Sequence, residues 1–219
     1  MHTRHSCPRS EYPEHQSTRG FAGKLQFAPG KEPEAAAKDL GWQGLQFLSR
    51  DKKNIAKFQV DLFSFSRLEP YETWESFSHE ALRLWRIHAD LSQPSEIERI
   101  GVRFINRFPL PEGEKTVQVS DYFKAHADDL PELNLQLAGF FHHETMTVPG
   151  HPYAINIIKT VQPAEVSGME TAFILDIDVM TLLETKMEEI EQRLTEFHWL
   201  KNKAFFGIIT EKLTESLRE

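Results

Sequence analysis

Apolar and polar side chains alternate along residues 99–108, and this period of two constrains the fold more than any other feature of the chain. The even positions carry the apolar side chains Ile100, Val102, Phe104 and Phe108. Successive side chains of a β-strand point to opposite faces of its sheet. The segment is therefore predicted to be a half-buried strand whose even positions face a core.

Similar alternation recurs in five other short segments, which we also predict to be strands: 45–48, 56–68, 135–146, 153–162 and 171–179. The connections between most of them are short, which favours antiparallel neighbours. Within 56–68 the apolar set changes phase after Leu62, and we interpret this slip as a β-bulge. We expect a mainly antiparallel sheet of about six strands.

Two segments show helical spacing instead. Residues 70–91 are predicted to form a helix that begins at Pro70, ends before Pro94 and packs on the sheet with one apolar stripe: Trp74, Phe77, Ala81, Leu84, Trp85 and His88. Residues 181–217 are predicted to form a C-terminal helix or helical hairpin. Strands and helices together indicate an α+β fold.

The first 40 residues differ in composition from the rest of the chain. They contain four prolines, three histidines and few β-branched residues. Such a segment buries too little apolar surface to offset its ordering entropy. We therefore predict a mobile tail over residues 1–40 and a single α+β domain over residues 41–219.

Composition narrows the classes of function. A net charge of −8 argues against a general nucleic-acid coat protein, although it leaves room for a local basic patch. The single cysteine, Cys7, excludes an internal disulfide and a thiolate metal cage. No apolar segment is long enough for a membrane helix, and the N-terminal residues lack the apolar core of a secretory signal, so we expect a cytoplasmic location without membrane association.

Two segments carry a resemblance to a known family. The first runs from Phe63 to Trp74 and contains Pro70-Tyr71-Glu72-Thr73-Trp74; the second is Arg99-Ile100-Gly101-Val102-Arg103-Phe104-Ile105-Asn106. They resemble the Pro-Tyr-x-x-Trp helix start and the Arg-(Ile/Leu)-Gly-(Leu/Val)-Arg-(Tyr/Phe)-Ile-Asn strand of an uncharacterised family of prokaryotic proteins that is distributed sporadically among bacteria and archaea. The resemblance covers roughly residues 41–215. It implies a prokaryotic cytosolic protein and no particular reaction.

The predicted strand 99–107 places Arg99, Arg103 and Arg107 on one face, with same-face neighbours about 7 Å apart. Arginine binds carboxylate and phosphate groups through paired N–H donors, so this row is a candidate surface for an acidic protein partner or a nucleic acid. The alternative is that the arginines pair with acidic residues of neighbouring elements on a solvated sheet face. Asn106 falls on the apolar side, where its amide needs hydrogen-bond partners and has a structural role.

A second hypothesis places a metal-dependent enzyme site near Asp176, Asp178 and either His142 or His143. Carboxylates and imidazoles together bind divalent metals. The two histidines are adjacent on a strand and face opposite sides, so only one of them can join the site, with Asp176, Asp178 and His143 as the alternative metal set. No phosphate-binding loop, dinucleotide-binding glycine motif, zinc-protease motif or nucleophile elbow is present in the sequence. We therefore favour a non-enzymatic binding or regulatory module with no cofactor and leave the metal enzyme as the alternative.

Overall fold

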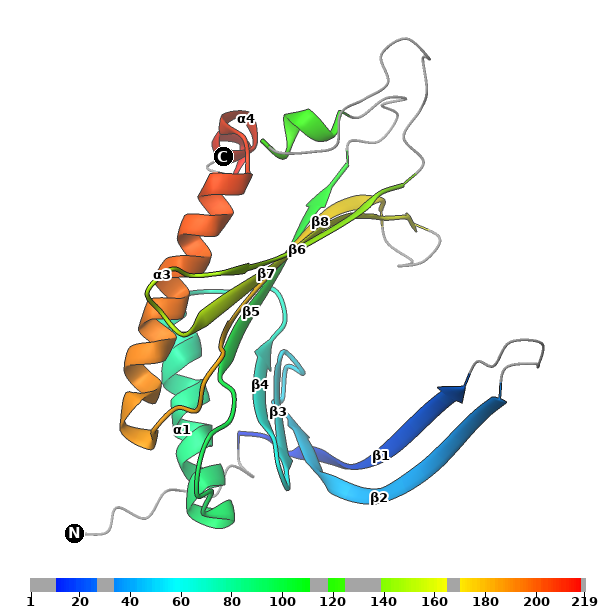
Figure 1. Cartoon of the computed structure of the whole chain (residues 1–219), viewed down its shortest axis with the longest axis vertical. Helices are drawn as coiled ribbons and strands as arrows, with labels where there is room; N and C mark the ends of the chain where they lie inside the picture. Colours follow the sequence, from blue (N-terminus) through cyan, green and yellow to red (C-terminus); the bar gives the residue numbers. More distant parts are fainter. Residues whose placement is uncertain (1–10, 27–33, 111–117, 125–138, 165–169, 218–219) are drawn as a thin grey trace. The chain divides into compact units, whose positions relative to one another are not determined.

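The computed structural model describes residues 11–26, 34–110, 118–124, 139–164 and 170–217. It divides into two compact units, residues 1–95 and residues 96–219 (Figure 1). Each unit contains a four-stranded antiparallel sheet. The α+β prediction is confirmed, but the strands belong to two sheets of four, and the single domain predicted over residues 41–219 is divided after Ser95.

Unit 1 contains strands β1 (Glu14–Gln26), β2 (Glu34–Leu48), β3 (Asn54–Gln59) and β4 (Phe63–Arg67), which pair in this order. Residues 14–26 and 34–40 were expected to lie in a mobile tail, and the structure corrects this prediction. β1 pairs with β2 along its whole length, so the backbone N–H and C=O groups of the two strands bond to each other. The two strands are ordered by this pairing and not by an apolar core. Composition alone gives no sign of that pairing.

The phase change after Leu62 is a chain reversal and not a bulge. Strand β3 ends at Gln59 and strand β4 begins at Phe63, and the backbone N–H of Gln59 donates to the carbonyl of Leu62 at 2.8 Å. Both a tight turn and a bulge swap the face on which apolar residues fall, so alternation could not separate the two.

Helix α1 spans Trp74–Ser92 and packs on the sheet of unit 1. The Thr73 hydroxyl caps its first turn by accepting from the Ser76 backbone N–H, so the helix begins four residues after the predicted Pro70. It ends at Gln93, which has a left-handed conformation directly before Pro94. The apolar stripe of α1 meets aromatic side chains of β2, β3 and β4, and the shared core is Tyr12, Ala56 and Leu84 with Phe47, Phe58, Phe63, Phe65 and Ile87 around it.

Unit 2 contains strands β5 (Gly101–Pro109), β6 (Phe141–Thr147), β7 (Tyr153–Gln162) and β8 (Ala172–Thr181), arranged as β5-β8-β7-β6. The predicted strands at 99–108, 153–162 and 171–179 are found within one or two residues. The predicted strand at 135–146 is found only as β6, and residues 135–138 lie outside the described residues.

Helix α3 (Ile190–Ile208) and the short helix α4 (Glu211–Ser216) form the C-terminal part of unit 2. Thr181 ends strand β8, so the helical region begins later than the predicted residue 181. The ring of Phe197 on α3 meets Tyr153 of β7 at 5.0 Å, and the Lys201 ammonium lies 3.9 Å from the ring centre of Phe104 on β5. Helix α3 thus covers one face of the sheet. No helix among the described residues combines the length and the apolar character needed to cross a bilayer.

Candidate functional site

The sheet of unit 2 has a second face, opposite to the one that α3 covers. On strand β5, Val102 and Phe108 are buried on the α3 side, whereas Arg103 and Ile105 point the other way and are exposed. Register places Asp178 opposite Arg103 and Asp176 opposite Ile105, and residues that pair across strands share a face. We call the surface formed by Arg103, Ile105, Asp176, Asp178 and their neighbours on this side the arginine face.

Arg103 is held by a buried carboxylate. Its Nε donates to Asp176 Oδ1 at 2.9 Å and to Oδ2 at 3.1 Å, and its Nη2 also donates to Oδ2. Asp176 is buried, while 57% of the Arg103 side chain is exposed. The hydrogen bonds to Asp176 raise the pKa of Arg103, so the guanidinium is charged at any physiological pH.

Arg99 makes a more exposed pair with the neighbouring acid. Its Nη2 donates to Asp178 Oδ2 at 3.0 Å, and its Nε approaches the sulfur of Met180 at 3.3 Å. Gly101 lies between the two arginines, and a Cβ added there would come within 3.3 Å of Asp178 Oδ1 and 3.4 Å of Arg99 Nη2. The gap that Gly101 leaves on the strand is therefore filled by the Arg99–Asp178 pair.

Arg107 differs from the other two arginines because it has no carboxylate partner among the described residues. Its Nη2 donates to the backbone carbonyl of Glu170, which lies two residues before the start of β8. Its Nε is buried without a hydrogen-bond partner in the described part of the chain. The three arginines thus lie on one strand in three different environments and do not form a uniform row of free cations.

Asn106 lies on the α3 side of β5, where the sequence places it. Its Nδ2 donates to the carbonyl of Leu175, its cross-strand partner on β8, at 3.0 Å. The amide therefore ties together two neighbouring strands. This contact satisfies a half-buried polar group and gives Asn106 a structural role.

A shallow pocket of about 250 Å³ opens on the arginine face. Its lining residues come from all four strands: Arg103, His143, Asn156, Ile158, Asp176 and Asp178. The pocket therefore contains the guanidinium of the first hypothesis and three of the groups of the metal hypothesis. The hydroxyl of Thr145 donates to the amide oxygen of Asn156 at 2.7 Å, which fixes the amide at the edge of the pocket.

Asp176, Asp178 and His143 line the same pocket, but their side chains are not arranged as a metal site. His143 lines the pocket, whereas His142 faces the other side and its Nε2 lies 3.2 Å from Glu144 Oε1. Asp176 and Asp178 each accept hydrogen bonds from an arginine. In the described ranges, no group of three or more His, Cys, Asp or Glu side chains is placed to hold a metal ion.

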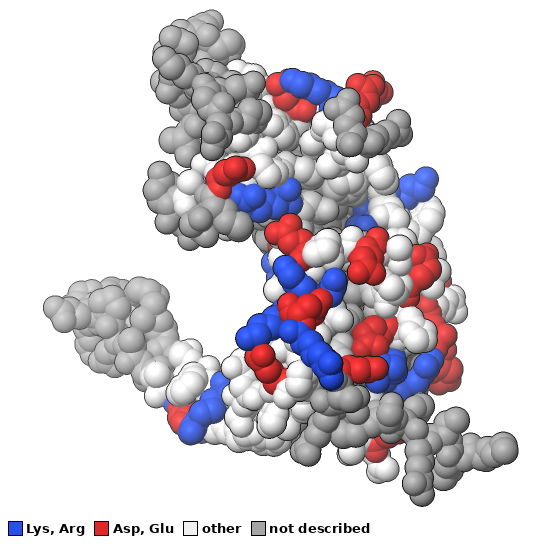
Figure 2. Space-filling model, turned by 180° about the vertical axis from the view of Figure 1, so that it is seen from behind, with Lys and Arg blue, Asp and Glu red and all other residues white. Residues whose placement is uncertain are grey.

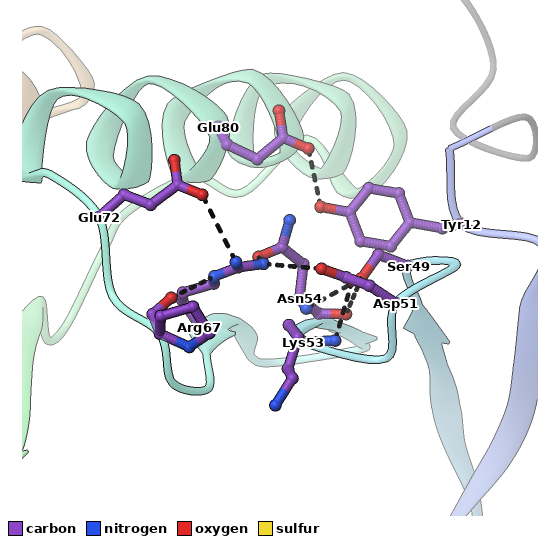
Figure 3. Close-up of polar contacts among 9 residues, drawn as sticks. Tyr12, Ser49, Asp51, Lys53, Asn54, Arg67, Glu72 and Glu80 are labelled. Carbon is purple, nitrogen blue, oxygen red and sulfur yellow. Dashed lines mark hydrogen bonds and ion pairs between the residues drawn. The ribbon is translucent and has the colours of Figure 1, made fainter.

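Unit 1 contains a second polar cluster, which sequence reasoning missed (Figure 3). Arg67 is mostly buried; its Nη1 donates to Asp51 Oδ2 and to Asn54 Oδ1, both at 3.2 Å, and its Nε donates to the Pro70 carbonyl at 3.1 Å. It thus ties the β2–β3 turn to the segment that leads into α1. The only sequence signal was the segment from Phe63 to Trp74, which was noted for its family resemblance and not for the chemistry of Arg67.

The Arg67 cluster perturbs the acid at its edge. A hydrogen bond from the Ser49 hydroxyl, helped by the backbone N–H of Lys53 at 3.0 Å, lowers the pKa of Asp51 to about 2. Nearby, the Tyr12 hydroxyl donates to Glu80 Oε1 at 2.8 Å, and burial with this contact raises the pKa of Tyr12. Arg67, Asp51 and Glu80 are each used in internal contacts, so we assign the cluster a structural role.

The charge distribution limits what the surface can bind. On the side of the molecule seen in Figure 2, basic and acidic side chains of the described residues are interspersed, and these residues form no broad area of a single sign. Interspersed charges suit selective contacts with a partner of mixed character better than the binding of a long polyanion.

Comparison with known proteins finds no match for the chain among family models, curated protein sequences or solved structures.

Proposed function

We propose that this chain is a non-enzymatic binding module, and that the arginine face of unit 2 binds an acidic segment of a protein partner. The observation that carries the proposal is the state of Arg103, which is anchored and exposed at once. Asp176 holds Nε and Nη2, while Nη1 has no hydrogen-bond partner among the described residues. A guanidinium has five N–H donors, so the two on Nη1 remain for a second carboxylate.

The anchor also lowers the cost of binding. A free arginine loses rotamer entropy when it binds a ligand, and Asp176 has already fixed the Arg103 side chain. The pocket beside it supplies the amide of Asn156 and the imidazole of His143, which add donors and acceptors for a peptide backbone. Ile105, whose exposed fraction is 62%, adds an apolar contact on the same face.

A protein segment fits this surface better than a nucleic acid. Strong phosphate binding needs several uncompensated cations, and its free energy grows with their number. Here Asp176 and Asp178 offset two of the three arginines, and both acids would face the phosphates. A segment with a few acidic groups and an apolar side chain meets Arg103 and Ile105 with less repulsion. The family resemblance, the prokaryotic origin and the cytoplasmic location remain predictions.

Fluorescence anisotropy with two probes tests the proposal. One probe is a short labelled peptide of glutamates interrupted by leucines; the other is a labelled single-stranded DNA of mixed sequence. We expect saturable binding of the peptide that weakens with added salt, and weaker binding of the DNA.

The informative variant is Arg103→Lys, because lysine keeps the charge beside Asp176 but has no second pair of donors. We expect it to weaken peptide binding about tenfold, or about 1.4 kcal/mol. The matched control is Arg50→Lys at an exposed turn of unit 1, which should leave the affinity unchanged. Equal affinities of the two variants, or no peptide binding by the unmodified chain, would overturn the proposal, and tighter binding of DNA would favour a nucleic-acid partner instead.

A further inference from the structure

Part of the sheet of unit 1 consists of only two strands. Strand β3 pairs with β2 from Gly44 to Leu48, so residues 34–42 of β2 have β1 as their only strand neighbour among the described residues. We call residues 19–26 of β1 and 34–42 of β2 the β1–β2 arm; Figure 1 shows these two strands continuing beyond β3. A two-stranded ribbon without further packing is marginally stable in water.

The arm exposes large apolar side chains on one side. Arg19 pairs with Trp42 and Phe21 pairs with Asp39, so these four residues share a side, which by alternation along β1 is also the side of Phe47. Phe47 is packed against the core beneath α1, whereas 68% of Phe21 and 59% of Trp42 are exposed. The surface that α1 covers on the sheet thus continues uncovered along the arm, within the part of the chain that is described.

Strand β1 is also an edge strand of 13 residues. Its outer backbone groups have no strand partner among the described residues. Long exposed edges are templates for pairing with another chain, and proteins usually shorten, bend or cover them. The two register shifts of this pair add extra residues to β2, so β1 itself runs regularly. The edge is therefore suited to accept a further strand.

The distribution of charge along the chain favours a second copy of this chain as the partner that supplies the further strand. The whole chain has a net charge of −8, so two copies repel each other over most of their surfaces. Strands β1 and β2 contain three basic and three acidic residues and are neutral together: Glu14, Arg19, Lys24, Glu34, Lys38 and Asp39. Two copies can approach each other along this element without net repulsion.

We propose that two copies of the chain pair antiparallel through their β1 edges, which joins the two arms into one sheet and packs Phe21 of each copy against the β1 strand of the other, forming a twofold-symmetric dimer. With Gly20 at the symmetry axis, Arg19 of one copy lies opposite Phe21 of the other, which sets a cation against an aromatic face. The exposed apolar surface of Phe21 and Trp42 amounts to roughly 280 Å² per copy. A stable interface buries about 800 Å² per partner, so the paired edges supply the remainder.

Sedimentation velocity on the full chain tests the dimer. The unmodified chain should sediment as a dimer at micromolar concentrations. The variant Phe21→Ser/Trp42→Ser should sediment as a monomer. The matched control is Val60→Ser/Leu91→Ser, which removes two apolar side chains that are 72% and 79% exposed in the same unit but outside the arm, and it should remain a dimer.

Hydrogen exchange separates loss of the interface from loss of the fold. In the unmodified chain, protection of the amides of residues 14–26 should increase with protein concentration, while protection within α1 should not. Three results would each overturn the proposal. The unmodified chain could be a monomer at all concentrations, the variant Phe21→Ser/Trp42→Ser could remain a dimer, or the protection of the β1 amides could be independent of protein concentration. A nucleic-acid or heterologous protein partner predicts the last of these outcomes.

Discussion

Arg103 and Asp178 are cross-strand partners in register, yet Arg103 forms its hydrogen bonds with Asp176, the acid two residues earlier on β8. Because Arg103 bonds to Asp176, Asp178 is left to pair with Arg99. Two ion pairs therefore lie side by side along strands β5 and β8. It also buries the Asp176 carboxylate beneath an exposed cation. The arginine face is thus held together by its own ion pairs, and we propose that it is also a binding surface.

Replacing Arg103 by alanine should destabilise unit 2. Asp176 would remain buried without its cation, and an acceptor left unsatisfied costs about 1–3 kcal/mol. Arg99→Ala, which breaks the more exposed pair, should cost about 0–1 kcal/mol. Native-state hydrogen exchange of the β8 amides measures both changes locally, without requiring the two units to unfold together. If Arg103→Ala and Arg99→Ala lost the same amount of stability, the burial of Asp176 would have no energetic consequence.

Gly44→Ala should disrupt the pairing of β2 with β3. Gly44 has a φ of +152°, and an added Cβ would lie 2.1 Å from the carbonyl oxygen of Phe58 and 2.7 Å from the Cα of Gln59. A clash with backbone cannot be relieved by a rotamer change, so we expect a loss of about 3 kcal/mol or more. The loss is measured by urea denaturation followed by circular dichroism.

Gly207→Ala is the matched control for that substitution. Gly207 lies inside α3, and an added Cβ meets no atom within 4 Å. Alanine there should stabilise the helix by about 0.5–1 kcal/mol. If Gly44→Ala caused no loss of stability while Gly207→Ala was stabilising, the backbone conformation assigned to Gly44 would be wrong.

Unit 1 should lose stability in mild acid because of His88. Its imidazole is buried against the rings of Phe58, Phe63 and Trp85, and burial lowers its pKa. The unfolded chain takes up a proton near pH 6.5 while the folded chain does not, so this group destabilises the fold as pH falls below about 6.5. Tryptophan fluorescence during urea unfolding at about pH 7.5 and about pH 5.5 measures the difference, since three of the four tryptophans lie in unit 1.

The substitution His88→Leu isolates that contribution. It removes the titrating group and keeps an apolar side chain among the three rings, so the loss between the two pH values should become smaller. If the stability of His88→Leu depended on pH as strongly as that of the unmodified chain, groups other than His88 would be responsible for the loss in acid.

The Ser49 hydroxyl should control the acidity of Asp51. Its hydrogen bond is the largest cause of the lowered pKa of that carboxyl, ahead of the Lys53 backbone N–H and of Arg67. In Ser49→Ala the Asp51 pKa should rise from about 2 toward its ordinary value. Arg67→Gln should raise it less. Carboxyl-carbon NMR titrations measure both, and the reverse order would contradict the assigned hydrogen bonds.

The sequence predicts the parts of this fold that depend on local period. Alternation along residues 99–108 identifies β5 and its two faces, and the stripe from Trp74 to His88 identifies α1. The errors occur where one pattern has two physical causes. The phase change after Leu62 fits a bulge and a tight turn equally, and a proline-rich N-terminal segment fits both a tail and a strand that pairs with its neighbour.

The candidate site was predictable in part for the same reason. Alternation places the three arginines on one side, and the strand also fixes Asn106 on the other. Their partners depend on which strand lies beside β5, and β8 follows β5 by more than 60 residues in the chain. Neither the diagonal contact of Arg103 with Asp176 nor the Arg67 cluster has a local sequence signature. To predict a contact between distant segments, one must know which strands are paired and in which register. No short stretch of the sequence carries that information.

Peptide titration followed by amide NMR tests the binding surface most directly. Addition of the glutamate–leucine peptide to the full chain should shift the amide signals of Arg103, Ile105, His143 and Asn156, which lie together on one face of the unit 2 sheet. The same titration of Arg103→Lys should produce smaller shifts at these positions. Shifts confined to residues around Arg67 or along helix α3, with the four signals unmoved, would contradict the account.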